Sequence, residues 1–334
     1  MNVAFDSRAA RDCRGIGRYA ACLLDALRLA QHGEIEETHD PRPRRSEIYH
    51  SPWIDGALLR APMPMVVTVH DLIPLKHRGE YLRSGVRLKM RYLAVQRAVR
   101  VIVPTTVVAD DVMRVLGIPA ERIEVIGEAA DHSFRRRAPD EVATVRQRYH
   151  LPDRYLLWVG SLQSPEPRKR VAALARAGRS LPLVLVGPTG PWARELPDVT
   201  LTHRVPDDDL AAIYTGAHAL VFPSEDEGFG LPPVEALACG TPVVACDVPA
   251  VREVLDGRIE LCELGDMAAL MAAAEAASRP APAPLLWSWE DAARATWDVY
   301  EDALRAPRMW RGAALASRPR RGQMRSQERL RLGH

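Results

Sequence analysis

The sequence is poor in cysteine and has no long hydrophobic run. Its five cysteines are scattered over 334 residues, and no two of them form a Cys-x-x-Cys pair. This odd, unpaired set argues against a disulfide framework and a zinc site, and it fits a reducing compartment. No apolar run reaches the ~18 residues that a membrane span needs, and the first residues lack the apolar core of a signal peptide. We therefore expect a cytoplasmic protein rather than a secreted, membrane-spanning or zinc-binding one.

Lysine is also scarce, and the positive charge is unevenly distributed. Only Lys76, Lys89 and Lys169 stand against 42 arginines, which makes each lysine worth attention. The net charge of +2 conceals a basic tail, because residues 306–334 carry eight arginines and a single acidic residue. The rest of the chain is mildly acidic and has no recognised nucleic-acid motif, so no nucleic-acid partner is expected.

The basic tail, residues 306–334, has no apolar periodicity, so we expect it to be disordered. Two interpretations of its charge remain open. It is either a solvated appendage or a weak contact with anionic lipid at the inner face of the membrane, where each arginine contributes ~1 kcal/mol.

The composition and the pattern of hydrophobic runs predict a two-domain α/β protein. With 47% hydrophobic and 26% charged residues, the chain is typical of globular proteins, and its length suggests two domains. Short aliphatic runs alternate with amphipathic stretches, which indicates parallel sheets covered by helices. We expect two doubly wound, Rossmann-like domains at 1–150 and 151–287, facing a central cleft. A helix at 288–305 follows, with Ser288 as its N-cap.

The predicted elements follow this alternation along the chain. Strands are expected at 3–5, 48–50, 65–69, 101–103, 123–126, 155–159, 183–186, 200–202, 219–222 and 242–246. Helices are expected at 18–30, 84–98, 107–116, 169–179, 207–216, 233–239 and 288–305. Residues 31–46 are polar and carry no clear element, and the proline-rich residues 279–284 form a stiff linker.

The segment 223–240 is the richest candidate site, because it follows a strand and ligands of open α/β sheets bind at strand carboxyl ends. Gly228 and Gly230 let backbone N–H groups approach a ligand closely. Glu227 lies in the loop, and Glu235 lies in the first turn of the next helix. Two isolated glutamates would be explained by solvation and by the helix dipole. Glycines, prolines and acids together on one such turn favour a binding site instead.

Three further turns carry candidate residues. Arg168 and Lys169 are expected at the start of a helix, where positive side chains are unfavourable next to the helix dipole. Their presence suggests that they and the helix N-terminus bind an anion such as phosphate. A solvated basic turn is the alternative. Gly15 and Gly17 precede a helix without forming the dinucleotide-binding pattern, so a simple tight turn is the alternative there. His70 directly follows a buried strand, and a structural role for it is about as plausible as a functional one.

These segments resemble the retaining glycosyltransferases of family 4, which have the GT-B fold. The strongest match is PSEDEGFGLPPVEALACGTPVVACDVPAVREV at 223–254, with the E-x7-E pair of that family in Glu227 and Glu235. Weaker matches follow in the order of the family: GIGRY at 15–19, TVHDLIPL at 68–75, EPRK at 166–169, LVLVGP at 183–188 and SWEDAARATWDVYEDAL at 288–304.

The resemblance implies a division of labour and a set of site residues. The first domain would bind the acceptor and the second the nucleotide-sugar donor, and the last helix would cross back onto the first domain. Glu235 would hold the donor ribose, Glu227 the donor sugar, and Arg168 and Lys169 the diphosphate, with His70 beside the sugar. The expected catalytic residues are His70, Arg168, Lys169 and Glu227. The expected donor-binding residues are Gly15, Gly17, Ser161, Arg168, Lys169, Glu227, Gly228, Phe229, Gly230, Leu231 and Glu235.

Three departures from the family pattern affect these expectations. Ser161 stands where many relatives have a basic residue, so phosphate binding depends on Arg168 and Lys169. Residues 163–165 lengthen the approach to this cationic turn. Residues 31–46 look too short for the usual strand and helix, which suggests a trimmed acceptor domain.

The activity implied is transfer of a sugar to a hydroxyl group with retained anomeric configuration, as in polysaccharide biosynthesis. GDP-mannose is the favoured donor, with UDP-glucose and dTDP-rhamnose open, and no metal or other cofactor is expected. The acceptor is a glycan, a lipid-linked saccharide or a small molecule. A nucleotide-sugar epimerase, a glycosidase that uses Glu227 and Glu235, and a degenerate scaffold of the same fold are the alternatives.

Overall fold

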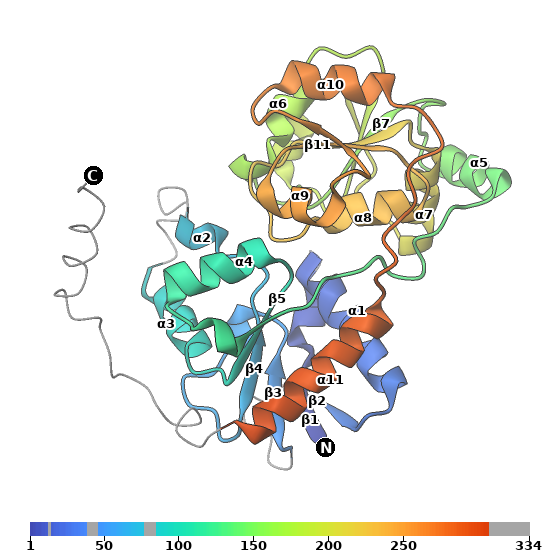
Figure 1. The fold of residues 1–334 in the computed structure, drawn as a ribbon. Coiled ribbons are helices and arrows are strands. Elements are labelled where there is room, and N and C mark those ends of the chain that lie inside the picture. The colour runs from blue at the N-terminus through green and yellow to red at the C-terminus, as the bar shows by residue number, and fades with distance from the viewer. Residues whose placement is uncertain (13–14, 39–45, 77–84, 307–334) are drawn as a thin grey trace, which may run out of the picture.

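The computed structural model describes residues 1–12, 15–38, 46–76 and 85–306, and they form two α/β domains (Figure 1). In the first domain, six parallel strands form one sheet in the order β2-β1-β3-β4-β5-β6. Its strands are β1 (Asn2–Asp6), β2 (Glu34–Thr38), β3 (Ile48–Ser51), β4 (Met65–Thr68), β5 (Arg100–Val103) and β6 (Ile123–Val125). The predicted tail lies outside the described residues except for Ala306.

The second domain holds a second parallel sheet in the order β12-β11-β10-β7-β8-β9. Its strands are β7 (Leu156–Val159), β8 (Leu183–Val186), β9 (Val199–Leu201), β10 (Ala219–Phe222), β11 (Val243–Cys246) and β12 (Glu260–Cys262). The strand order reverses between β7 and β10, which start the two halves of the sheet. Such a switch point is where open α/β sheets bind ligands.

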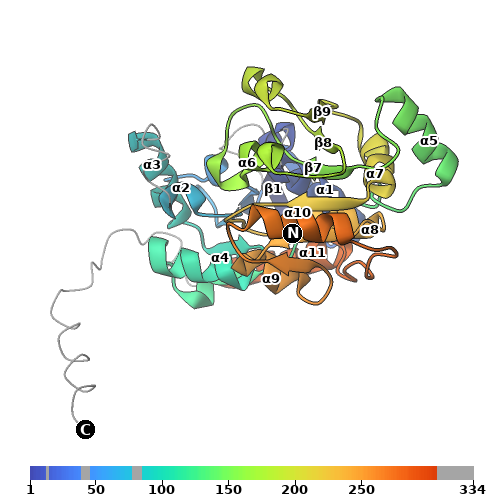
Figure 2. The same ribbon diagram turned by 90° about the horizontal axis from the view of Figure 1, so that it is seen from above.

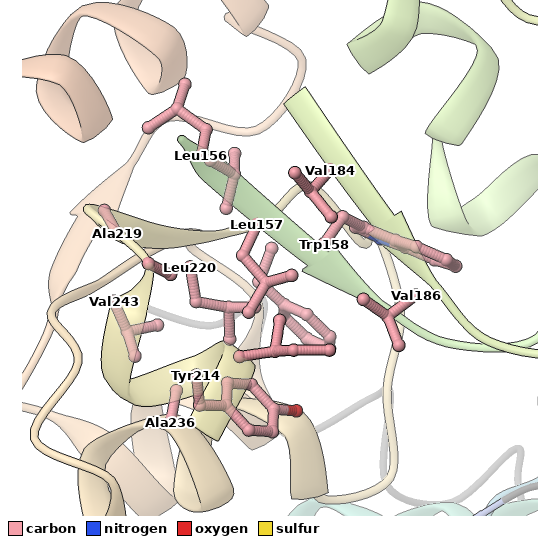
Figure 3. Close-up of a cluster of buried hydrophobic side chains, with 14 of the residues drawn as sticks. Leu156, Leu157, Trp158, Val184, Val186, Tyr214, Ala219, Leu220, Ala236 and Val243 are labelled. Atoms are coloured by element: carbon pink, nitrogen blue, oxygen red, sulfur yellow. The ribbon is translucent and has the colours of Figure 1, made fainter. Parts of the chain in front are cut away.

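The aliphatic runs form strands because both faces of these sheets are covered. Figure 3 shows Leu156, Leu157 and Trp158 of β7 among side chains from β8 and β10, with Tyr214 below them. Trp158 pairs in register with Leu185, and all four residues of β8 are buried. Burial on both faces explains why these strands read as continuous hydrophobic runs.

Helices connect the strands and cover both faces of each sheet. They are α1 (Gly15–Ala30), α2 (Ile73–Lys76), α3 (Gly85–Val95), α4 (Thr106–Asp111), α5 (Pro139–Arg148), α6 (Val171–Arg176), α7 (Asp207–Gly216), α8 (Leu231–Ala238), α9 (Pro249–Leu255), α10 (Met267–Ala276) and α11 (Trp289–Arg305). Among these described helices, none is both long enough and apolar enough to cross a bilayer.

The last helix crosses back onto the first domain, as predicted. Ser288 caps α11 by accepting a hydrogen bond from the Asp291 N–H at 3.2 Å. The helix then packs along α1 (Figure 1), where the Trp297 indole donates to the Leu27 carbonyl at 3.3 Å. The fold class predicted from the sequence is therefore confirmed.

The prediction that residues 31–46 carry no element is wrong, because β2 (Glu34–Thr38) extends the first sheet beside β1. Its side chains are mostly exposed, since β2 is an edge strand that needs no hydrophobic run. Residues 39–45 lie outside the described residues. The sequence analysis also missed α2, α5, α9, β12 and α10, and α10 (MAALMAAAEA) is so rich in alanine that it shows little apolar periodicity.

Candidate functional site

The loop after β10 is pressed against the first domain. A Cβ on Gly228 would lie 1.9 Å from the carbonyl oxygen of His70, so only glycine allows this approach. The Thr105 hydroxyl donates to the Gly228 carbonyl at 3.0 Å. Gly230 then opens α8 with φ at +104°, in the left-handed region that favours glycine. Both predicted glycines are thus required by the backbone of this loop.

At the switch point of the second sheet, Arg168 contacts the first predicted glutamate, Glu227, and both predicted cations contact Glu166. Arg168 and Lys169 follow β7 in a 3-10 turn, and Glu227 follows the neighbouring strand β10. The Arg168 guanidinium lies 3.0 Å from Glu227 and 2.9 Å from Glu166, and it donates to the Asp226 carbonyl at 2.7 Å. Lys169 Nζ lies 3.3 Å from Glu166. The structure therefore brings three predicted residues together and adds Glu166.

The electrostatics of this cluster keep its charges in place. Burial alone would raise the pKa of Glu166, but Lys169 and Arg168 outweigh it and hold that pKa below its ordinary value. Burial also opposes the charge of Arg168, yet Glu227 and Glu166 raise its pKa. Two cations thus face two carboxylates, and an anionic ligand could replace a carboxylate as the partner of Lys169 or Arg168.

Glu235 lies in the second turn of α8 rather than in the predicted first turn, because the helix begins at Leu231. It is deeply buried and has partners on two sides. It is 3% exposed, and it accepts a hydrogen bond from the Tyr214 hydroxyl at 2.9 Å. Its other oxygen lies 3.2 Å from Nε of Arg18, which belongs to the first domain. Burial raises the pKa of Glu235, while Arg18 and Tyr214 oppose that rise.

His70 uses both ring nitrogens within the first domain. Nδ1 lies 3.0 Å from a carboxylate oxygen of Glu128, and Nε2 lies 2.9 Å from the carbonyl oxygen of Pro52. Because both neighbours accept hydrogen bonds, the doubly protonated ring fits this environment best. Burial lowers the pKa of His70, but Glu128 and the Pro52 carbonyl raise it above its ordinary value overall. The side chain of His70 thus belongs to a buried ion pair, and its carbonyl oxygen meets Gly228.

We expect His70→Gln to destabilise the protein by about 2 kcal/mol at pH 6, the loss typical of a charged hydrogen bond. Because the pKa of His70 is raised in the folded protein, its charge stabilises the fold fully below the unfolded pKa of 6.5. This stabilisation is lost as the pH rises through the pKa of the folded state. The destabilisation should therefore shrink at pH 9, measured by urea unfolding. His132→Gln, at an almost fully exposed histidine, is the control. An effect of His70→Gln that is equal at both pH values would contradict the charged pair.

The other predicted site residues lie around Arg168, Glu227 and Glu235 and have different roles. A Cβ on Gly17 would lie 1.9 Å from the Asp12 carbonyl, and a Cβ on Gly15 would lie 3.6 Å from Leu231, so the glycine turn reaches the start of α8. Phe229 and Leu231 are buried in the core of the second domain, which leaves their backbone for ligand contacts. Ser161 is partly exposed after β7.

Several residues at this interface were missed by the sequence analysis. Lys76 of α2 lies 3.1 Å from Asp111 in its own domain and 2.8 Å from Asp226, the neighbour of Glu227. Glu253 of α9 accepts hydrogen bonds at 2.7 Å from both the backbone N–H and the hydroxyl of Thr106. Figures 1 and 2 both place α4 next to α9. The scarcity of lysine had marked Lys76, but nothing in the sequence indicated its partners.

A cavity of about 390 Å³ lies elsewhere, between α1, α8 and the two segments that join the domains. None of the predicted site residues lines it. The predicted site lies on another part of the interface between the domains, where the contact of Gly228 with His70 packs them closely. Among the described residues, no cluster of three or more histidine, cysteine or acidic side chains could hold a metal ion.

Comparison with known proteins gives matches over both domains. A profile described as Glycosyltransferase Family 4 matches residues 46–134, and one described as Glycosyl transferases group 1 matches residues 153–279. The O-antigen chain mannosyltransferase B of Escherichia coli is 28% identical over 80% of this chain and 74% of that protein. A D-inositol 3-phosphate glycosyltransferase of Xylanimonas cellulosilytica is 30% identical over 75% of this chain and 70% of that protein.

Solved structures share this two-domain fold. Alr3699/HepE of Anabaena, in complex with UDP and glucose, has a TM-score of 0.63 at 17% identity and covers 91% of this chain and 95% of its own. Sucrose-phosphate synthase from Thermosynechococcus elongatus has a TM-score of 0.65 at 19% identity, with coverage of 91% and 96%. At these identities the likeness concerns the fold, and it agrees with the fold predicted from the sequence.

Proposed function

Because this chain belongs to glycosyltransferase family 4, we propose that it transfers a hexose from a nucleoside diphosphate sugar to a hydroxyl group. The observation that carries the proposal is the cluster at the switch point of the second sheet. There, Arg168 lies 3.0 Å from Glu227, with Lys169 beside them. Cations next to a carboxylate suit a ligand in which a diphosphate is joined to a sugar. The diphosphate needs positive charge, and the hydroxyls of the sugar need hydrogen-bond acceptors.

In the proposed complex, each part of the donor has its own partner. Arg168 and Lys169 neutralise the diphosphate, and Glu227 accepts hydrogen bonds from hydroxyls of the sugar. The backbone N–H groups between Gly228 and Leu231 line the same turn. Glu235, farther along α8, accepts hydrogen bonds from the ribose. The acceptor then lies at the switch point of the first sheet, between β1 and β3.

The proposed reaction keeps the configuration at the anomeric carbon. The acceptor oxygen bonds to that carbon on the face from which the diphosphate leaves, and the bond from the anomeric carbon to the phosphate oxygen breaks. The acceptor proton passes to the leaving phosphate oxygen, so no protein nucleophile takes part. Arg168 and Lys169 stabilise the charge that grows on the diphosphate, and such preorganised charge is usually the largest contribution to catalysis. Closure of the two domains orients the reactants and excludes water.

Mannose is the sugar that we favour, with GDP-mannose as its donor. The support comes from the similarity to O-antigen chain mannosyltransferase B. UDP-glucose is the main competitor, since a structurally similar protein was solved with UDP and glucose. For the acceptor, the same O-antigen relative favours a glycan or a lipid-linked saccharide, and we place the reaction in the cytoplasm.

The test is release of nucleoside diphosphate from GDP-mannose, UDP-glucose, UDP-N-acetylglucosamine and dTDP-rhamnose, with Glu235→Ala as the control. We expect slow hydrolysis of one donor by the wild type and at least a tenfold loss in the variant, because an unpaired ribose hydroxyl costs over 1 kcal/mol. Calorimetry with GDP, UDP and dTDP accompanies the assay. Absence of both hydrolysis and nucleotide binding would contradict the proposal and favour a scaffold protein.

A further inference from the structure

We infer that Arg18 is a positioning residue for the donor, which holds the carboxylate of Glu235 from the opposite domain. Donor binding then depends on contact between the domains. The inference rests on the proposed role of Glu235 as the ribose ligand. Arg18 itself belongs to α1 of the first domain, on the side that we assign to the acceptor.

The guanidinium of Arg18 spans the two domains through specific contacts. Its Nε lies 3.2 Å from Glu235, and its Nη2 lies 2.8 Å from Asp207 at the start of α7. Its plane lies over the ring of Phe134, 4.6 Å from the ring centre. Phe134 belongs to the segment that joins the domains, and its ring also contacts Tyr214 edge to face. Two carboxylates and an aromatic ring thus fix one guanidinium in place.

The start of α1 explains why Arg18 reaches this place. Gly17 packs directly on the Asp12 carbonyl, and this contact fixes the first turn of the helix. Gly15 lies against Leu231, the first residue of α8, so the first turn of α1 faces the first turn of the helix that carries Glu235. Arg18, one residue beyond Gly17, then reaches across to Glu235.

A buried carboxylate needs such a partner in order to remain charged. Glu235 has Tyr214 on one oxygen and Arg18 on the other, and each oxygen retains a further lone pair for a ribose hydroxyl. Without Arg18, burial would favour the protonated acid, which has fewer acceptor sites. Arg18 therefore supports both the charge and the orientation of Glu235.

The guanidinium also keeps one unused donor. Nη1 of Arg18 is buried and has no hydrogen-bond acceptor within the described part of the chain. Buried donors are nearly always paired, so an oxygen atom of a bound nucleotide would complete this site.

The test compares Arg18→Met, Asp207→Asn and Asp208→Asn with the wild type. Calorimetry measures binding of GDP and UDP, and donor hydrolysis gives KM and kcat. We expect Arg18→Met to raise the Kd for the bound nucleotide and the donor KM about tenfold, with kcat changed less than threefold. Asp207→Asn removes the second partner of Arg18 but leaves the contacts of Glu235 in place. It should raise both the nucleotide Kd and the donor KM about threefold. Asp208, the next residue, pairs with Arg137 instead, so Asp208→Asn should change neither.

Two outcomes would overturn the inference, and one control separates it from the proposed function. Unchanged or tighter nucleotide binding by folded Arg18→Met would exclude a positioning role. If Arg18→Met does not fold, an unchanged Kd in Asp207→Asn excludes it equally. Glu235→Ala should weaken nucleotide binding in any case. If Glu235→Ala binds nucleotide as well as the wild type, the proposed role of Glu235 is wrong. If Glu235→Ala weakens nucleotide binding but Arg18→Met does not, only the inference about Arg18 is wrong.

Discussion

We expect Lys169→Ala to lower kcat for donor turnover by a factor of about 100 or more while leaving the fold intact. The factor is typical of the loss of one preorganised charge or donor at a reacting centre. The side chain of Lys169 is 19% exposed, and it pairs at 3.3 Å with Glu166, three residues earlier in the chain. A partly exposed pair of this kind contributes about 1 kcal/mol or less to stability. Catalysis and stability should therefore respond very differently.

The measurement combines donor hydrolysis with urea unfolding of the same protein. Lys89→Ala is the matched control, because Lys89 is an exposed lysine on α3, and it should change neither quantity. The effect should fall on kcat more than on KM, since the charge of the diphosphate grows as the bond to the sugar breaks. A folded Lys169→Ala protein with unchanged donor turnover would contradict the role of the cationic turn.

Much of this site could be predicted because its residues lie close together on loops that follow strands. The strands around β7 and β10 are continuous hydrophobic runs, so their ends could be found in the sequence. Glu227 and the pair Arg168 and Lys169 follow two such ends. Parallel strands present their carboxyl ends at one edge of a sheet, and β7 and β10 are neighbours. The contact of Arg168 with Glu227 follows from that arrangement.

The contacts between the domains could not be predicted in the same way. Arg18 meets Glu235, and Lys76 meets Asp226, only because two separately folded domains are placed against each other. Hydrophobic periodicity describes the inside of each domain and carries no information on this placement. The edge strand β2 was missed for a related reason, since exposed polar side chains leave no pattern.

The second large effect is expected at Arg168, where activity and stability should fall together. Arg168 lies within 3.0 Å of both Glu227 and Glu166, and its side chain is 13% exposed. Arg168→Ala leaves both carboxylates without this partner in a region of low exposure. Removing one member of a buried ion pair costs about 3 kcal/mol. We expect that loss in urea unfolding at pH 7, with donor hydrolysis below detection.

The pH dependence of this loss tests its cause. The pKa of Glu166 is lowered in the folded state, so its charge stabilises the protein above the unfolded pKa of 4.5. That contribution is lost as the pH falls through the lowered folded value. The difference between Arg168→Ala and the wild type should therefore shrink towards acid pH, where the carboxylates take up protons.

Two variants complete the test of Arg168. Arg168→Lys keeps the charge but loses the planar fork, so it should recover part of the stability and little of the activity. Arg176→Ala, at an exposed arginine on α6, should stay within about 0.5 kcal/mol of the wild type. If Arg168→Ala were as stable as Arg176→Ala at pH 7, the ion pair with Glu227 would be a surface contact. Unchanged donor hydrolysis by folded Arg168→Ala would contradict its role at the diphosphate.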